Sequence, residues 1–386
     1  MKIAESYFRL GTENAFIILS KAKELETQGK EIINLGIGQP DFLTPKHIVD
    51  AAKKALDEGH HGYTPANGTI ELREGVSRHI KKMYGAEIDS ERVFIAPGGK
   101  PSMFFAIMMF GQPGVEIIYP EPGFPIYESV INYSGAKAVP MYLSEEKNFS
   151  FNADEVLNLI NEKTRLLIVN NPQNPTGGLI EKSEIDKLVK GLKKFPHVAV
   201  FSDEIYSRQI YDGKSMPSFF YYPELYDRLI VMDGWSKTYA MTGWRLGWSV
   251  WPKSLVENVT KMAINSYSCV SAANQVAALA ALEGSHEFID DMMKKFDKRR
   301  NLIVNGLNSI TGVKCNNPGG AFYAFPNISE TGMTGEIFAE KCLFDAGVAI
   351  VPGTSFGKSC SDYVRFSFAN SYDNIEKALE KIRKII

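Results

Sequence analysis

Residues 231–248 read VMDGWSKTYAMTGWRLGW. The apolar, β-rich start followed by small residues predicts a strand that ends just before Lys237, at a turn where a pocket can open. Arg245 follows after a glycine-containing loop. A lysine amine forms Schiff bases with carbonyl compounds, so Lys237 is a candidate nucleophile. A single lysine after a strand is more often a solvated surface residue, and the interpretation therefore depends on partners elsewhere in the chain.

The length and composition indicate a two-domain globular protein. At 386 residues the chain exceeds one average core, and we expect two domains or one large domain with a smaller companion. Lys and Arg number 43 against 45 Asp and Glu, a net charge of −2 without a dominant charged run. This balance argues against nucleic acid or a membrane surface as partner. The four cysteines form no Cys-x-x-Cys pair, so we expect reduced thiols and no metal site.

The N-terminal residues and the apolar runs bear on the compartment. Residues 1–6 lack the apolar core of a signal peptide. No apolar run reaches the roughly 18 residues of a membrane span. We therefore expect a cytoplasmic protein that makes no use of a membrane.

The fold prediction rests on alternating strands and helices after residue 92, which is typical of a mainly parallel sheet covered by helices on both faces. Strands are predicted at 93–96, 116–119, 137–141, 166–170, 198–202, 229–232 and 246–250. A helical pattern at 253–283 and a long amphipathic helix at 286–307 come next. Short strands with helices between them predict a smaller α+β unit, at 313–315, 321–325, 348–351 and 363–367. Ligands should gather at the carboxyl ends of the parallel strands.

Several predicted strand ends carry residues suited to chemistry. The segment 97–100 leads glycines from a strand into a helix, which suits a phosphate but also fits a plain turn. Asp203 ends another strand, where a carboxylate raises the pKa of a base beside it, although an isolated acid there could cap a helix. The Asn-Pro pairs in 171–175 are turn formers in their own right. Arg365 within an apolar strand points to an anionic ligand or a buried ion pair.

Residues 236–247, SKTYAMTGWRLG, resemble the cofactor-attachment signature of the class I/II aminotransferases, the aspartate aminotransferase-like family of fold type I. NPQNPTG at 171–177 resembles a second motif of that family, and further matches follow in the same order over nearly the whole chain. The resemblance implies an α/β fold with a mainly parallel central sheet, helices on both faces and a smaller α+β domain. It also implies pyridoxal 5′-phosphate (PLP) as cofactor.

The resemblance implies a role for each matched residue. Lys237 would hold the cofactor and act as general base and acid, and Asp203 would face the ring nitrogen. Tyr206 and Asn174 would bind the phenolic oxygen, and Phe124 would stack on the ring. The residues implied to hold the phosphate are Gly99, Lys100, Ser236, Arg245 and, across a homodimer, Tyr63. The residues implied to bind the substrate are Gly38, Asn174 and Arg365, the last of them through the α-carboxylate.

The implied reaction moves an amino group from an L-amino acid to a 2-oxo acid, expected to be 2-oxoglutarate, by a ping-pong mechanism. Segment 264–271 carries no cation for a distal carboxylate. Either another basic group serves an aspartate donor, or the donor is neutral or aromatic. A PLP-dependent β-lyase or another fold type I enzyme stays an alternative. A non-catalytic regulator is disfavoured, because no spare basic segment exists for DNA.

The domain boundaries are also expectations. Residues 1–45 should form an N-terminal arm and part of the small domain. Residues 46–290 should form the large PLP-binding domain, and 291–386 the small C-terminal domain. The long helix at 286–307 should bridge the two domains.

Overall fold

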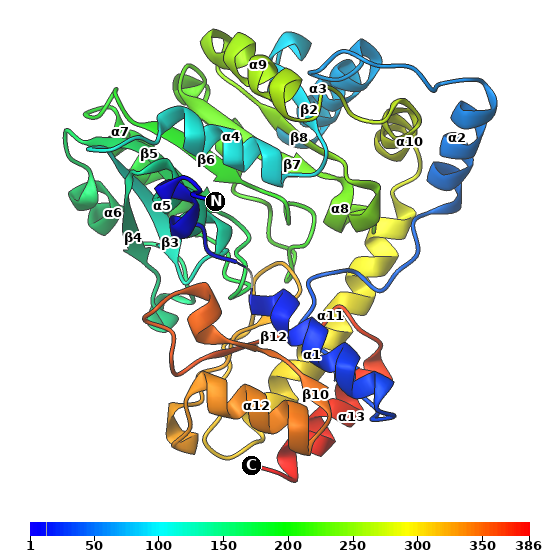
Figure 1. The fold of residues 1–386 in the computed structure, drawn as a ribbon, viewed down its shortest axis with the longest axis vertical. Helices are drawn as coiled ribbons and strands as arrows, with labels where there is room; N and C mark the ends of the chain where they lie inside the picture. Colours follow the sequence, from blue (N-terminus) through cyan, green and yellow to red (C-terminus); the bar gives the residue numbers. More distant parts are fainter. Residues whose placement is uncertain (13) are drawn as a thin grey trace.

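The computed structural model describes residues 1–12 and 14–386, without the side chains of 14–17 and 19. The elements form two groups, one around a large sheet and one around short strands near the C-terminus (Figure 1). Helix α11 (Glu287–Asn308) runs from the first group into the second. The expected α/β fold with a mainly parallel central sheet is confirmed.

The central sheet has seven strands in the order β2-β8-β7-β6-β5-β3-β4. Only β8 runs against its neighbours, and the other strands share one direction. The carboxyl ends of those strands therefore lie along one edge of the sheet. The strand bounds are β2 (Val93–Ala96), β3 (Glu116–Glu121), β4 (Lys137–Tyr142), β5 (Thr164–Asn170), β6 (Ala199–Asp203), β7 (Leu229–Gly234) and β8 (Gly247–Val250).

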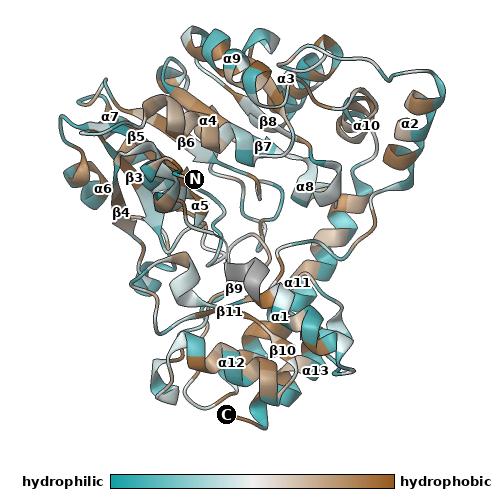
Figure 2. Ribbon diagram, viewed as in Figure 1, coloured by the Kyte–Doolittle hydropathy of each residue, from teal (hydrophilic) through white to brown (hydrophobic). Residues whose placement is uncertain are grey.

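Helices cover both faces of this sheet, because its inner strands are apolar on both sides. In β5, Leu166 and Ile168 face one hydrophobic cluster, and Leu167 and Val169 face another. The first cluster is completed by α4 (Lys100–Phe110), α5 (Ile126–Ser134) and α9 (Val256–Ser266). The second is completed by α2 (Lys46–Asp57), α3 (Ile70–Tyr84), α6 (Ala153–Leu159), α7 (Lys182–Leu192) and α10 (Ala272–Glu283). Figure 2 shows α4 as mostly hydrophobic and α2 as amphipathic.

The C-terminal group has its own sheets and its own core. One sheet has the order β11-β12-β9 and is antiparallel, and in the other β1 pairs in parallel with β10. The N-terminal strand thus belongs with the C-terminal group. The core of this group is aromatic, with Phe296, Phe322, Phe338 and Phe366 fully buried. The elements are β1 (Ile33–Asn34), β9 (Tyr323–Ala324), β10 (Val348–Ala349), β11 (Val351–Pro352), β12 (Val364–Ser367), α1 (Asn14–Thr27), α12 (Gly335–Asp345) and α13 (Tyr372–Arg383).

Two predictions of local structure are wrong. The helical pattern at 253–283 is broken into α9 and α10, because Ser268 has a left-handed φ of 65° and Ser271 caps the start of α10. The strand predicted at 313–315 is a single bridge between Lys314 and Asn327. The ladder stops there because the Asn308 side chain takes both backbone groups of Cys315: the Cys315 N–H donates to Asn308 Oδ1 at 2.8 Å, and Asn308 Nδ2 donates to the Cys315 carbonyl at 3.0 Å.

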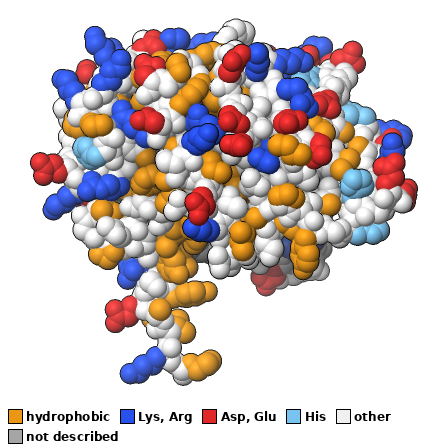
Figure 3. Space-filling view, turned by 90° about the horizontal axis from the view of Figure 1, so that it is seen from above, with side chains coloured by type: hydrophobic (Ala, Val, Ile, Leu, Met, Phe, Trp, Pro, Cys, Tyr) orange, Lys and Arg blue, Asp and Glu red, His pale blue; other side chains and the backbone are white. Residues whose placement is uncertain are grey.

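The surface carries charges of both signs. Lysine and arginine side chains alternate with acidic ones over the face in Figure 3, as the net charge of −2 leads one to expect. The N-terminal end projects from the body, with Met1, Ile3 and Phe8 exposed. Among residues 1–12 and 14–386 no helix is both long and apolar enough to cross a bilayer.

Candidate active site

A cavity of about 490 Å³ opens at the carboxyl edge of the central sheet, beside the C-terminal group. A volume of this size accommodates a small-molecule ligand. Every sequence-predicted site residue except Tyr63 lines it. Those residues are Gly38, Gly99, Lys100, Phe124, Asn174, Asp203, Tyr206, Ser236, Lys237, Arg245 and Arg365.

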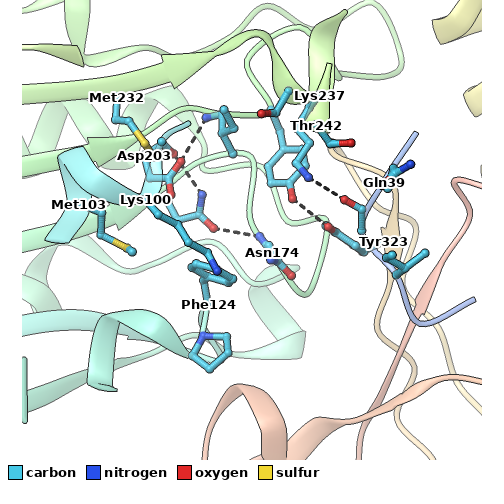
Figure 4. Close-up of a pocket in the computed structure, with 18 of the residues that line it drawn as sticks. Gln39, Lys100, Met103, Phe124, Asn174, Asp203, Met232, Lys237, Thr242 and Tyr323 are labelled. Carbon is cyan, nitrogen blue, oxygen red and sulfur yellow. Dashed lines mark hydrogen bonds between the residues drawn. The ribbon is translucent and has the colours of Figure 1, made fainter. Parts of the chain in front are cut away.

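The strand ends explain why residues far apart in the sequence meet here. Gly99 follows β2, Phe124 follows β3 and Asn174 follows β5. Asp203 is the last residue of β6, and Lys237 lies in the short helix α8 (Trp235–Thr238) directly after β7. Because these strands are parallel, their carboxyl ends present all five residues to one cavity (Figure 4).

Asp203 is a buried carboxylate with donors arranged around it. Its Oδ2 accepts a hydrogen bond of 2.6 Å from the Tyr127 hydroxyl, and its Oδ1 accepts one of 3.2 Å from the Ile205 N–H. Burial raises the pKa of Asp203 to about 6, while the Tyr127 bond, the Ile205 N–H and the positive charge of Lys237 pull this pKa down. Asp203 is therefore ionised above about pH 6, and a cationic ligand beside it would lower its pKa further.

Lys237 presents its amine to the same cavity. Its Nζ donates to the carbonyl oxygen of Gly38 at 2.6 Å and lies 5.9 Å from the ring centre of Phe322. Its own backbone carbonyl accepts a hydrogen bond of 2.9 Å from Gln209. The hydrogen bond from Gln209 holds the backbone of Lys237 at the sheet edge. The bond to Gly38 holds its amine against the N-terminal segment.

The start of α4 forms a cradle for an anion. Gly98 has φ +89°, and a Cβ added there would overlap the guanidinium of Arg245. Arg245 is anchored by a bond of 2.8 Å from its Nη1 to the Thr242 carbonyl. The N-terminal N–H groups of α4 begin at Gly99 and Lys100, and the Ser236 hydroxyl lines the same part of the cavity. Helix N–H groups together with a guanidinium suit a phosphate.

Arg365 is a second arginine that lines the cavity, besides Arg245. It is 4% exposed, and its guanidinium carbon lies 4.5 Å from the ring centre of Tyr323 and 4.7 Å from that of Phe356. Its Nη1 donates to Asn174 Oδ1 at 2.9 Å, and its Nη2 donates to the Gly36 carbonyl at 2.5 Å. Asn174 thus uses its acceptor oxygen on Arg365, and its amide nitrogen is the end suited to donate to a ligand.

Tyr63 does not reach this cavity within its own chain, and its side chain is 94% exposed. Sequence reasoning also missed two residues that the structure brings in, Tyr127 and Tyr323. Tyr127 comes three residues after Phe124, at the start of α5, and the two ring centres lie 5.8 Å apart, so its closeness to Phe124 is a weak signal that could have indicated it. Tyr323 is separated from its partner Tyr206 by 117 positions, and the sequence contains no local signal for that contact.

An amine and a buried carboxylate around one cavity, together with the cationic groups Arg245 and Arg365, suit an enzyme that binds a phosphorylated carbonyl cofactor and a small anionic substrate. Comparison with known proteins specifies the class. The sequence pattern of the family described as "Aminotransferase class I and II" matches residues 30–382. The chain belongs to this family.

Named relatives and solved structures agree with that assignment. The aspartate aminotransferase of Pyrococcus horikoshii is 39% identical over 95% of this chain and 94% of its own length. Aromatic-amino-acid aminotransferase 2 of Thermococcus litoralis is 36% identical over 93% of both chains. The crystal structure of the Rhizobium meliloti aspartate aminotransferase superposes with a TM-score of 0.94 at 32% identity, covering 100% of this chain and 98% of that one.

The protein is therefore a transaminase, which acts on amino acids and 2-oxo acids and uses PLP as cofactor. The cavity fits PLP at both ends. The cradle at Gly98, into which a Cβ could not be placed, suits the phosphate, and buried Asp203 suits a protonated ring nitrogen. No group of His, Cys, Asp and Glu residues in the described part of the chain is arranged to hold a metal ion.

The Tyr127 hydroxyl should set the pH at which Asp203 ionises. We expect Tyr127→Phe to raise the pKa of Asp203, because the hydrogen bond from this hydroxyl lowers it. The acidic limb of the kcat/KM profile should then move to higher pH by about 0.4 to 1 unit. The measurement is kcat/KM against pH for both proteins.

Tyr222→Phe is the matched control, since the Tyr222 hydroxyl donates to Asp186 at 2.6 Å outside the cavity. Its profile should coincide with that of the unmodified enzyme. Coincident profiles for Tyr127→Phe would contradict the proposed electrostatic coupling.

Proposed function

We propose that this transaminase takes an acidic amino acid such as aspartate as donor and 2-oxoglutarate as acceptor, with Lys237 as its catalytic lysine. The observation that carries the proposal is the meeting of five charged side chains around one cavity. Asp203, Lys237, Arg245 and Arg365 line it together with Lys100, which lies at the start of α4. The name of the Pyrococcus horikoshii relative, aspartate aminotransferase, supports the same donor.

When bound, PLP supplies an electron-withdrawing ring that stabilises negative charge at the substrate α-carbon. In our proposal Lys237 Nζ removes the α-proton and later returns a proton, as general base and acid. Asp203 holds a proton on the ring nitrogen by its opposite charge. Tyr206 and Asn174 would donate to the phenolic oxygen of the bound cofactor, and Phe124 would supply an aromatic face for its ring.

Arg365 is proposed to bind the α-carboxylate of both substrates. A guanidinium has five N–H donors, enough to bind a carboxylate besides Asn174 and the Gly36 carbonyl. Two aromatic rings pack against it and hold the guanidinium plane in place. Gly38 contributes backbone beside this carboxylate. Gly99, Lys100, Ser236 and Arg245 hold the phosphate, the first two through backbone N–H groups.

Removal of the Lys237 amine tests the central assignment. Lys237→Ala should lose turnover by more than about 10⁴-fold and lose the visible absorbance of the lysine-bound cofactor. In the unmodified enzyme, borohydride reduces the carbon–nitrogen double bond between the lysine and the cofactor and makes the attachment permanent. Mass spectrometry should then find the cofactor on the peptide that contains residue 237. Lys253→Ala, on the surface, serves as control. Cofactor found on another lysine, or transamination retained by Lys237→Ala, would refute the assignment.

The Lys100 side chain is proposed to bind the distal carboxylate of the substrates. Its Nζ lies 5.5 Å from the ring centre of Phe124, so it flanks the ring proposed to cover the cofactor (Figure 4). Donor and acceptor use the same cavity in turn, and one cation can therefore serve both aspartate and 2-oxoglutarate. An aromatic donor is the second candidate, supported by the name of the Thermococcus litoralis relative.

Lys100→Met separates these donors while it keeps the backbone N–H. We expect kcat/KM for aspartate to fall about 10- to 100-fold, since a charge-assisted hydrogen bond is lost. The value for phenylalanine should stay constant or rise. Steady-state kinetics with both donors gives the comparison. An equal loss for both donors would instead place the Lys100 side chain on the cofactor, and an unchanged aspartate value would exclude it from recognition.

A homodimer is proposed because Tyr63 is exposed in its own chain but is implied to bind a cofactor phosphate. The projecting N-terminal end adds exposed apolar side chains that a second copy could cover. In such a dimer each cavity would be completed by the partner subunit. The surface facing the partner would follow two-fold symmetry.

Mixing two impaired variants tests this arrangement. Lys237→Ala and Tyr63→Ala are each assayed alone at limiting cofactor, then together after subunit exchange. If Tyr63 serves the neighbouring cavity, a mixed dimer holds one intact site, and activity should recover to about a quarter of the unmodified value. No recovery, or an active monomer in light scattering, would contradict the dimer.

The domain division is proposed at the boundaries expected from the sequence: 1–45 and 291–386 for the arm and the small domain, and 46–290 for the large domain. Support comes from the sheets, since all strands of the central sheet lie within 93–250. The pairing of β1 with β10 supports the inclusion of N-terminal residues in the small domain. The cytoplasmic location stays a prediction.

A further inference from the structure

Two tyrosine hydroxyls meet inside the cavity. The Tyr206 and Tyr323 hydroxyl oxygens lie 2.8 Å apart, and their rings cross edge to face at a centroid distance of 5.7 Å. Figure 4 shows this bond as a dashed line at Tyr323. Tyr206 follows strand β6 of the central sheet, and Tyr323 begins β9 of the C-terminal group. The bond therefore joins the two halves of the molecule at the cavity.

The Tyr323 hydroxyl is fixed by its surroundings. A Cβ added to Gly38 would overlap it, so only glycine at position 38 leaves room for this hydroxyl. The Tyr323 ring also packs against the guanidinium of Arg365, whose carbon lies 4.5 Å from the ring centre. Tyr323 is 1% exposed and Tyr206 is 3% exposed. Neither phenol can move away from the other without disturbing the cavity wall.

The number of hydroxyl protons determines which tyrosine donates in the hydrogen bond between Tyr206 and Tyr323. Burial raises the pKa of Tyr206 well above its ordinary value, so its hydroxyl stays protonated. A phenol has one proton to donate. In the proposed function Tyr206 gives that proton to the phenolic oxygen of the cofactor. The proton in the bond between the two tyrosines must then come from Tyr323.

We propose that Tyr323 is a positioning residue, which donates its hydroxyl proton to the Tyr206 oxygen and so directs the Tyr206 proton to the phenolic oxygen of PLP. The inference rests on the proposed role of Tyr206. A hydroxyl that accepts a hydrogen bond becomes a stronger donor, because the two bonds polarise each other. Tyr323 thus acts on the cofactor through Tyr206 and needs no contact with it.

The visible absorbance of the PLP-loaded enzyme, measured against pH, provides the test. A donor at the phenolic oxygen stabilises negative charge there and lowers the pH midpoint of the colour change. Tyr206→Phe should raise the midpoint, and Tyr323→Phe should raise it by less, about 0.3 to 1 pH unit. The double variant should match Tyr206→Phe alone, because Tyr323 acts only through Tyr206.

Tyr211→Phe is the matched control. The Tyr211 hydroxyl is also buried, and it donates to the Ala321 carbonyl at 2.6 Å outside the cavity. Its absorbance midpoint should equal that of the unmodified enzyme. Thermal unfolding of the cofactor-free proteins shows whether each variant is folded, independently of activity.

Two results would overturn the inference: an unchanged midpoint for Tyr323→Phe, or an undiminished shift from this substitution in the Tyr206→Phe background. The proposed role of Tyr206 and the inferred role of Tyr323 can be contradicted separately. If Tyr206→Phe shifts the midpoint and Tyr323→Phe does not, only the inference fails. If Tyr206→Phe leaves the midpoint unchanged, the proposed role of Tyr206 fails and the inference falls with it.

Discussion

Parallel strands place their carboxyl ends along one edge of a sheet, and this constraint organises the site. The last residue of β6 is Asp203, and Lys237 follows β7, its parallel neighbour. The strands are largely apolar on both faces, and the polar side chains that line the cavity come mostly from the places where strands end. Because helices cover both faces of the sheet, the functional side chains lie at the edge formed by the carboxyl ends of the strands. The single reversed strand, β8, brings Gly247 against the start of α4, where the anion cradle forms.

The electrostatics of the cavity follow from its depth. A carboxylate as buried as Asp203 is costly to ionise, and its raised pKa of about 6 reflects that cost. Hydrogen bonds from Tyr127 and the Ile205 N–H offset part of the penalty. Glu204, the next residue, points to the other side of the strand, where Ser202 and Ser218 donate to it. Neighbouring acids thus have different surroundings, and only Asp203 faces the cavity.

Most strands and the positions of their ends could be predicted from local patterns of apolar run and turn, whereas the roles of the residues at those ends are implied by the resemblance to the aminotransferase family. The break between α9 and α10 could not be predicted, since it depends on a left-handed residue, Ser268, in a stretch with continuous helical periodicity. Tyr127 and Tyr323 could not be predicted as site residues for a different reason. Their hydrogen-bond partners lie 76 and 117 positions away, and only the folded chain brings them together. Polar contacts inside a cavity depend on tertiary structure, whereas motifs can be recognised from residues close together in the sequence.

The two sides of the cavity differ in origin, and this bears on how substrate preference can vary within the family. Most residues that suit the cofactor follow strands of the central sheet, whereas Arg365, Tyr323 and Phe356 come from the C-terminal group. Substitutions in one group can therefore reshape the substrate side while the sheet edge stays constant. Relatives of similar identity are named for aspartate and for aromatic amino acids. Lys100 is the exception, because it starts α4 beside the anion cradle and yet extends its amine toward Phe124. A recognition cation held on the constant side would let one enzyme keep dicarboxylate binding through both halves of its reaction.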